Sequence, residues 1–224
     1  MMKRQGIWDF WAKYYDRLWL QRVSLQPTRA LVCEKIMALM TLEGNQDTAQ
    51  TAQQTSRLNI LDMGCGTGQL YGDLLQALGK KQFHYLGIDP SGAMLEQAVD
   101  KFPEAAFFRS DVMDAKPDTE PNQRPFDVIV CSHSFPYYAD GEAALRNMAA
   151  MLRPGGQLLL SQACTNSVYD AAILKLTGLT TSKAVYRSSQ QMTALGSSLF
   201  RELKTFRISE KFFVPSLWFF QWVK

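Results

Sequence analysis

A glycine-rich turn that follows an acidic residue is the part of this sequence whose residue types could do chemistry. Residues 60–68 read Ile-Leu-Asp-Met-Gly-Cys-Gly-Thr-Gly, so an apolar run passes through Asp62 into a G-x-G-x-G segment. Glycines permit a tight turn and let a ligand approach the backbone closely. Because the turn lies between an expected strand and an expected helix, the sequence predicts a ligand-binding loop at Asp62–Gly68.

The charge and spacing of this loop favour one ligand over another. A dinucleotide loop has a third glycine, as G-x-G-x-x-G, and presents helix N–H groups to a pyrophosphate. Here Gln69 stands at the third glycine position, and the Asp62 carboxylate would repel a pyrophosphate. That carboxylate could instead attract an ammonium group, which S-adenosylmethionine carries together with a sulfonium. The loop therefore predicts S-adenosylmethionine rather than NAD.

Two further acids are expected at the same edge of the sheet. Asp89 ends the next expected strand, about 20 residues after the loop, where an acid can bind both hydroxyls of a ribose. Asp111 follows a third strand and could bind the amino group of an adenine, with Val112 packed on the ring. The carboxyl ends of parallel strands are where open α/β sheets bind ligands. The alternatives are a helix cap for Asp89 and an ordinary loop residue for Asp111.

His133 is the candidate catalytic residue. It follows the fourth expected strand, beside the expected position of the cofactor methyl group, in the segment Ser-His-Ser-Phe-Pro-Tyr-Tyr. A neutral imidazole there could take a proton from a hydroxyl or amine nucleophile. The alternative is a structural histidine that holds the loop. His84 lies in an expected strand and is expected to be structural.

Strands and helices alternate around these residues. Strands are expected at 58–63, 83–88, 106–109, 126–131 and 157–162, and helices at 68–78, 91–102 and 142–152. This alternation predicts an α/β fold, a Rossmann-like sheet with helices on both faces and right-handed crossovers. Strands at 203–214 and 217–223 are expected to form an antiparallel hairpin on the sheet edge. The result is a seven-stranded, mostly parallel sheet.

The N-terminal region is expected to form helices over 7–20 and 28–42, followed by a solvated loop. Its aromatic residues could form a lid over an apolar acceptor or could simply pack in the core. These residues are Trp8, Trp11, Tyr14, Tyr15 and Trp19. We expect one domain with residues 1–56 as helical lid and loop, 57–163 as cofactor-binding core, 164–200 as a substrate-side insert with helices at 166–179 and 188–197, and 201–224 as C-terminal strands.

The composition narrows the class of partner. A net charge of +3 over 224 residues is too weak to predict nucleic acid or an anionic membrane as partner. No apolar run approaches the roughly 20 residues of a membrane span, and the N-terminus lacks a signal-peptide pattern. The four cysteines have no metal-ligand spacing, so we expect free thiols and no metal site. A cytoplasmic monomer or homodimer acting on a small molecule fits best.

Five segments, in this order, resemble class I S-adenosylmethionine-dependent methyltransferases. They are ILDMGCGTG, GIDPS, SDV, FDVIVCSHSF and MLRPGGQLLL. The opening WDFWAKYYDRLW resembles the N-termini of the subgroup that includes the ubiquinone and menaquinone biosynthesis methyltransferases. The resemblance covers about residues 8–162 and implies methyl transfer from S-adenosylmethionine to a small acceptor at carbon, oxygen or nitrogen. Residues 164–200 match no pattern for one acceptor.

The resemblance also implies a set of cofactor contacts. Asp62, Gly64 and Gly66 would contact the methionine part, Asp89 the ribose, and Asp111 with Val112 the adenine. Tyr15 would close over the cofactor and Met94 would pack near the adenine. The expected site is completed by Met63, Cys65, Pro90 and Ser132, with no thiol chemistry for Cys65.

Three alternatives accompany this prediction. One is an NAD-dependent oxidoreductase on a similar fold, and another is a non-catalytic homologue that keeps the cofactor. The third is nucleic-acid methylation, but enzymes that methylate amino groups of bases often carry N/D-P-P-[YF] after the fourth strand. Here that place reads Ser-His-Ser-Phe.

Overall fold

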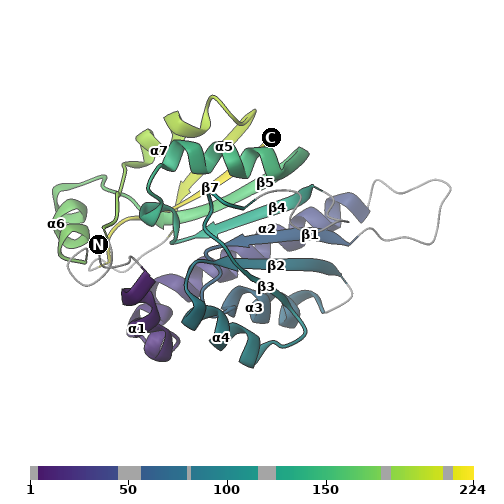
Figure 1. The fold of residues 1–224 in the computed structure, drawn as a ribbon. Helices are drawn as coiled ribbons and strands as arrows, with labels where there is room; N and C mark the ends of the chain where they lie inside the picture. Colours follow the sequence, from purple (N-terminus) through teal and green to yellow (C-terminus); the bar gives the residue numbers. More distant parts are fainter. Residues whose placement is uncertain (1–4, 45–56, 80–81, 116–124, 178–182, 209–213) are drawn as a thin grey trace.

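A seven-stranded sheet forms the centre of the molecule. The structure, a computed structural model, describes residues 5–44, 57–79, 82–115, 125–177, 183–208 and 214–224. The strands lie in the order β3-β2-β1-β4-β5-β7-β6 (Figure 1). They are β1 Leu58–Met63, β2 Phe83–Asp89, β3 Ala106–Arg109, β4 Phe126–Ser132, β5 Leu152–Ala163, β6 Glu202–Arg207 and β7 Leu217–Val223. β1 to β5 pair in parallel and β7 pairs antiparallel with β5 and β6, so the predicted fold class is confirmed.

Helices cover both faces of this sheet (Figure 1). One face carries α2 Gln26–Gly44, α3 Gln69–Leu78 and α4 Gly92–Lys101, and the other carries α5 Gly141–Met151 and α7 Ser189–Gly196. α1 Gln5–Tyr15 and α6 Val168–Thr177 lie beyond one end of the sheet. The alternation of side chains along β1 supplies both cores, because Leu58 and Ile60 pack toward α2 and α3 while Leu61 and Met63 pack toward α5.

The N-terminal region departs from the expected helix over 7–20. α1 ends at Tyr15, and a π-helical turn, η1 Gln21–Leu25, leads into α2. Pro27 gives a physical reason for this turn. Because proline has no N–H, it cannot donate the α-helical hydrogen bond to the carbonyl of Val23. The prediction that one helix continues to residue 20 is therefore wrong, and α2 extends beyond the expected 28–42 at both ends.

Two strand predictions also need correction. β5 was expected to begin at residue 157, but it begins at Leu152 and includes Pro154, Gly155 and Gly156. The strand accommodates them through an irregularity in its pairing with β4, opposite Phe126 and Val128. The hairpin lies on the sheet edge as expected, with β7 next to β5 and β6 outermost, but β6 ends at Arg207 rather than at the expected residue 214. Of the strand expected at 203–214, residues 209–213 lie outside the described part, as do 45–56 of the expected loop.

The region after β5 contains the two helices that the sequence predicts. α6 falls within the expected 166–179, and α7 begins with a capping box between Ser188 and Gln191. Met192 of α7 is fully buried in the core that α5 also covers. In the part of the chain that the structure describes, no helix has the length and apolar character needed to cross a membrane. The segment roles expected for 1–56, 57–163, 164–200 and 201–224 stay predictions.

Candidate active site

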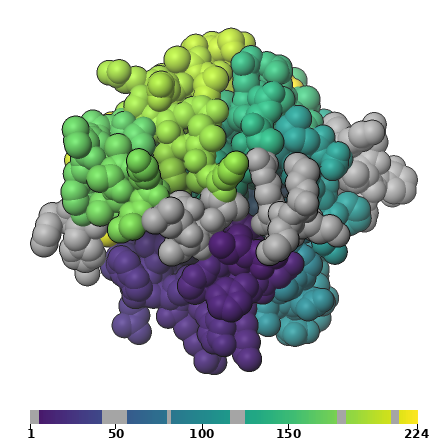
Figure 2. All heavy atoms as spheres, turned by 60° about the vertical axis from the view of Figure 1, so that its left-hand side comes forward, coloured from purple at the N-terminus to yellow at the C-terminus, as the bar shows by residue number. Residues whose placement is uncertain are grey.

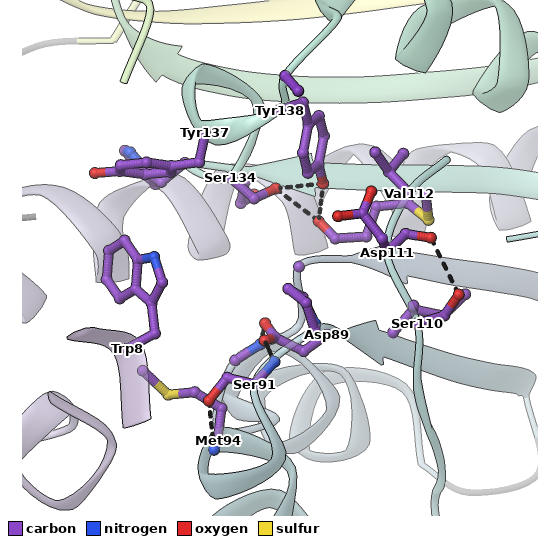
Figure 3. A pocket seen from close by; sticks show the side chains of 18 of the residues that line it. Trp8, Asp89, Ser91, Met94, Ser110, Asp111, Val112, Ser134, Tyr137 and Tyr138 are labelled. Atoms are coloured by element: carbon purple, nitrogen blue, oxygen red, sulfur yellow. Dashed lines mark hydrogen bonds between the residues drawn. The ribbon is translucent and has the colours of Figure 1, made fainter. Parts of the chain in front are cut away.

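A cavity of about 520 Å³ lies at the carboxyl ends of β1, β2 and β4. α1 and the short helix η2, Phe135–Tyr137, contribute to its wall. Most of the predicted site residues line it, namely Tyr15, Met63, Gly64, Gly66, Asp89, Pro90, Met94, Asp111, Val112, Ser132 and His133. The residues that the sequence analysis did not assign to the site are Trp8, Ile88, Ser91, Ser110, Ser134, Tyr137, Tyr138 and Ala139. Figure 3 shows Trp8 and Tyr137 at one side of the cavity and Asp111 and Val112 at the other.

Two glycines of the loop serve different purposes. Gly64 has φ of +79°, and a Cβ there would lie 2.4 Å from the Cβ of Ser134, so no side chain fits. Gly66 has φ of +54°, but the nearest atom to its Cβ position would be Cε1 of Tyr15 at 3.9 Å. The backbone of Gly66 therefore faces open space beneath the Tyr15 ring, where a ligand could contact it closely.

Four N–H groups of the loop are already used within the protein. Gly64 and Cys65 donate to the Ile88 carbonyl at 2.7 and 3.0 Å, and Gly68 donates to the Cys65 carbonyl. The Gly66 N–H donates to Oδ2 of Asp89 at 2.9 Å. A pyrophosphate site needs such donors to be free for the phosphate oxygens. This turn therefore suits a ligand without phosphate.

Asp89 is positioned by backbone donors on both sides. Its Oδ1 accepts from the Ser91 N–H and its Oδ2 from the Gly66 N–H, each at 2.9 Å. Each carboxylate oxygen can still accept a further hydrogen bond from a ligand hydroxyl. Burial raises the pKa of Asp89 to about 6. The N-cap of α4 is Ser91, whose Oγ accepts from the Met94 N–H, so Asp89 does not have that capping role.

Asp62 lies beside a second, smaller cavity rather than the large one. It is on the face of β1 that also carries Ile60, because alternate residues of a strand share a face. It lines a hollow of about 50 Å³ that shares Gly64, Gly66 and other residues with the large cavity. The Tyr85 hydroxyl donates to Oδ2 of Asp62 at 2.7 Å, and burial raises the pKa of this carboxyl to about 7.

Cys65 lines the same small hollow. Its side chain is buried, and burial raises the pKa of its thiol well above the ordinary value. The thiol is therefore protonated at neutral pH and is a poor nucleophile. The expectation of no thiol chemistry at Cys65 agrees with this environment.

Arg29 is a residue of the small hollow that sequence reasoning missed. Its Nε donates to Asp73 at 2.6 Å, and its Nη1 donates to Gln21 and Gln69 at 3.1 and 2.7 Å. Its Nη2 makes no hydrogen bond with any residue that the structure describes. A single arginine on an expected helix carries no sequence signal for a site. The fold alone brings it to the hollow that Asp62 also lines.

Acidic residues of the N-terminal region fix it against the loop and α4. The Ser91 hydroxyl donates to Asp9 at 2.6 Å, which joins α1 to the start of α4. Asp16, just after α1, accepts from the Thr67 hydroxyl at 2.6 Å and from the Gln69 amide at 2.9 Å. These contacts hold Tyr15 close to Gly66. Figure 2 shows α1 (purple) on the face where α6 (green) is also seen.

An aromatic wall closes the side of the cavity next to α1. The rings of Trp8 and Tyr137 meet edge to face with centroids 5.0 Å apart. The hydroxyl oxygens of Tyr137 and Tyr186 are 3.3 Å apart, and the Val185 N–H donates to the Pro136 carbonyl at 2.7 Å. The wall therefore combines three segments that are far apart in the sequence, which is why local patterns did not reveal it.

Asp111 and Val112 lie after β3 as predicted. The Asp111 side chain is exposed, and its Oδ1 accepts from the Met113 N–H at 3.0 Å. Val112 is buried at the cavity surface, and so is Met94. An exposed acid beside two buried apolar side chains could hold a flat ring with a polar edge.

His133 lines both cavities. Its backbone has φ of +59°, and its N–H donates to the Ser161 carbonyl at 2.7 Å. Burial lowers the pKa of the imidazole to about 4, so the ring is neutral at physiological pH. His133 is thus beside the cavity in the protonation state that the sequence hypothesis requires, and its catalytic role stays a prediction.

Comparison with known proteins agrees with this site. The model of a family described as a methyltransferase domain matches residues 13–198. Equisetin synthetase eqxS of Fusarium heterosporum is 28% identical over 123 residues, which are 53% of this chain, and the chain spans only 3% of that protein's length.

Two solved methyltransferases with bound S-adenosylhomocysteine share the fold. The magnesium protoporphyrin IX methyltransferase ChlM of Synechocystis PCC 6803 has a TM-score of 0.68 and 17% identity, over 99% of this chain and 100% of that one. The plantazolicin methyltransferase BpumL has a TM-score of 0.71 and 16% identity, over 99% of this chain and 95% of that one. The family match covers most of the chain, and the NAD alternative is not favoured. This chain belongs to the methyltransferase domain family, whose model matches residues 13–198.

Proposed function

We propose that this enzyme methylates a small, apolar or aromatic acceptor, and that the two cavities bind S-adenosylmethionine in one defined orientation. The observation that carries the proposal is the loop itself. Four of its N–H groups donate within the protein, while the Asp89 carboxylate faces the large cavity and Asp62 lines the small one. Such a site attracts hydroxyl and ammonium groups, and its two carboxylates disfavour a diphosphate.

In this orientation the nucleoside occupies the large cavity. The ribose hydroxyls donate to Asp89, and the adenine lies between Met94 and Val112 with its amino group toward Asp111. Tyr15 lies over the Gly66 backbone and helps to exclude water. The lining of the large cavity by all of these residues supports the arrangement.

The amino-acid end of the cofactor occupies the small hollow. Its ammonium group is attracted to Asp62, and its carboxylate to the unbonded Nη2 of Arg29. Both side chains line that hollow, and Asp73, Gln21 and Gln69 hold the Arg29 guanidinium in place without using Nη2. The ligand that fits this small site best is a zwitterion, with its ammonium group at Asp62 and its carboxylate at Arg29.

The protein's part in the reaction is alignment and proton removal. The cofactor supplies an electrophilic methyl group on sulfur. The chain must hold the acceptor atom about 3–3.5 Å from that carbon and exclude water. His133 accepts the proton that an O–H or N–H acceptor loses. Its neutral state at physiological pH, which burial maintains, supports this role.

The aromatic pair of Trp8 and Tyr137, which lines the large cavity, supports an acceptor with a flat or apolar body. ChlM is named for a porphyrin and BpumL is solved with a pentazolic compound, so the fold accommodates acceptors built from rings. All four cysteines are free thiols, which agrees with the proposed cytoplasmic location.

Calorimetric titration of the purified chain with S-adenosylhomocysteine and with NADH tests the cofactor assignment. We expect the first to bind and the second to show no saturable heat. Preferential binding of NADH would contradict the proposal. Incubation with labelled S-adenosylmethionine and a set of phenols, aromatic amines and activated carbon acids then tests turnover. Cofactor binding with no transfer to any of them would favour the non-catalytic alternative.

A further inference from the structure

His133 is held in a backbone conformation that is uncommon for residues with a side chain. Among the described residues it is the one non-glycine residue with positive φ, at +59°. For residues with a side chain this region costs free energy and persists where the surroundings determine it, often at functional sites. The Ser161 carbonyl holds the His133 N–H at 2.7 Å. The orientation of the ring is therefore imposed by neighbouring elements.

Thr28 of α2 contacts the imidazole ring of His133. Thr28 is fully buried, and its Oγ1 lies 3.2 Å from Nε2 of His133 and 2.8 Å from the carbonyl oxygen of Ser24. A hydroxyl has one hydrogen, and a carbonyl oxygen can only accept. The Thr28 hydrogen is therefore donated to Ser24, and Oγ1 accepts from the ring. It follows that the hydrogen of the neutral imidazole is on Nε2.

The nitrogen that remains, Nδ1, then has a free lone pair. It makes no hydrogen bond with any residue that the structure describes, and His133 lines the cavity where methyl transfer is proposed. In a neutral imidazole one nitrogen donates and the other accepts, so fixing Nε2 as donor fixes Nδ1 as acceptor.

We infer that Thr28 is a positioning residue that fixes the Nε2–H tautomer of His133, so that Nδ1 is the proton acceptor in methyl transfer. This inference rests on the proposed function. In the step, an acceptor lone pair bonds to the methyl carbon while the carbon–sulfur bond breaks with its electron pair going to sulfur. The acceptor's proton moves to Nδ1, and the resulting imidazolium later loses a proton to water.

The local structure explains how Thr28 is presented. Thr28 lies in the first turn of α2, directly after the π-helical turn η1 that contains Ser24. π-helical turns occur frequently at functional sites. Here the turn ends at Leu25, and the Ser24 carbonyl is within reach of the Thr28 hydroxyl. Ser24 and Thr28, which set the tautomer, are therefore four residues apart on one short segment. His133, directly after β4, contacts Thr28.

The ¹⁵N NMR spectrum of the imidazole reads the tautomer directly, without an acceptor. The chain has two histidines, and His84 is exposed on β2, so a His84→Gln parent leaves the His133 signals alone. We expect a protonated Nε2 and a bare Nδ1 between pH 6 and 8. Thr28→Ser should keep this pattern because it keeps the hydroxyl. Thr28→Val should shift population toward the Nδ1–H form and lower turnover, with circular dichroism used to verify folding.

A protonated Nδ1 in the His84→Gln parent would overturn the inference, even if Thr28→Val fails to fold. An unchanged tautomer in folded Thr28→Val would overturn it as well. Titration of the same samples with S-adenosylhomocysteine separates this inference from the proposed function. Absence of binding in the parent would contradict the proposed cofactor site, whereas the tautomer assignment depends on the spectrum alone.

Discussion

The cofactor side and the acceptor side of the cavity are built in opposite ways. On the cofactor side, the decisive hydrogen bonds join neighbouring strand ends, as between Gly66 and Asp89, or residues two apart, as between Asp89 and Ser91. On the acceptor side, Trp8 meets Tyr137, and Tyr137 meets Tyr186, across long stretches of chain. The first region is specified locally by sequence, and the second exists only when the whole fold is formed.

The two regions also differ in how tightly they are held. Four backbone N–H groups of the loop are hydrogen-bonded before any ligand binds, so the shape of the loop is preorganised and little free energy is lost in ordering it on binding. The aromatic wall depends on ring contacts and one tyrosine pair at 3.3 Å. We therefore expect changes in the loop to have large effects on stability and cofactor binding, and changes in the wall to have small ones.

The largest effect is expected for Gly64→Ala. The new Cβ would be 2.4 Å from Ser134, in addition to the cost of positive φ. Together these should cost about 2–5 kcal/mol in the free energy of unfolding. Gly79→Ala is the control for backbone strain, because Gly79 has φ of +77° and no atom of the described residues lies within 4 Å of its Cβ position. Urea denaturation of both variants measures the difference, and equal losses would show that contact with Ser134 is unimportant.

The next effect is expected for Asp89→Ala. Loss of a charge-assisted partner for the ribose should weaken S-adenosylhomocysteine binding by about 1.5–3 kcal/mol, roughly 10- to 100-fold. Asp89→Asn keeps an acceptor for a backbone N–H and should bind better than Asp89→Ala. Asp100→Ala, an exposed site on α4, serves as the control. Calorimetric affinities that match the unsubstituted chain would remove Asp89 from the ribose site.

The same contrast explains what could be predicted from the sequence. The glycine loop, the Ser91 cap and the acids after β2 and β3 follow from local patterns, and the structure has each at the expected strand end. Arg29 and Tyr186 could not be predicted, because an isolated side chain joins a site only through tertiary contacts. Asp62 was expected among the site residues. Its side chain lies on the same face of β1 as that of Ile60, because residues two apart in a strand share a face.

The hairpin lies on the sheet edge as predicted, but the order of its two strands could not be predicted, for a related reason. The sequence predicts two strands that pair with each other, but nothing local states which of them pairs with β5. The register between β5 and β7 extends from Gln157–Val223 to Ala163–Leu217, and it gives β7 neighbours on both sides. A strand with neighbours on both sides can be apolar over most of its length, and β7 has buried Leu217, Phe219, Phe220 and Trp222.

A smaller effect on ligand affinity is expected when the pH is changed. It distinguishes binding of the amino-acid end of the cofactor from binding of the nucleoside end. Burial raises the pKa of Asp62 to about 7, so this carboxyl is largely protonated at pH 6 and ionised at pH 8. An ammonium ligand prefers the ionised form, and its affinity should rise about tenfold over that interval. Asp89, whose pKa is about 6, also titrates in this range, but its titration affects the affinity for any nucleoside ligand. The ratio of affinities for S-adenosylhomocysteine and 5′-methylthioadenosine, which lacks the amino-acid end, therefore isolates Asp62.

Calorimetry at several pH values measures this ratio. We expect it to increase from pH 6 to pH 8 in the unsubstituted chain and to stay constant in Asp62→Asn. A ratio that is constant in both proteins would mean that the ammonium group does not interact with Asp62.

The smallest effect is expected for Tyr186→Phe, on the acceptor side. Losing the Tyr137–Tyr186 hydrogen bond should cost about 0.5–1.5 kcal/mol of stability and leave the affinity for S-adenosylhomocysteine unchanged. Tyr169→Phe is the control, since Tyr169 is 45% exposed on α6. A double-mutant cycle with Tyr137→Phe, followed by urea denaturation, gives the coupling between the two hydroxyls. If Tyr186→Phe weakens cofactor binding as much as Asp89→Ala does, the two sides of the cavity are one cooperative unit, because only an unfolded or shifted wall could reach the ribose site.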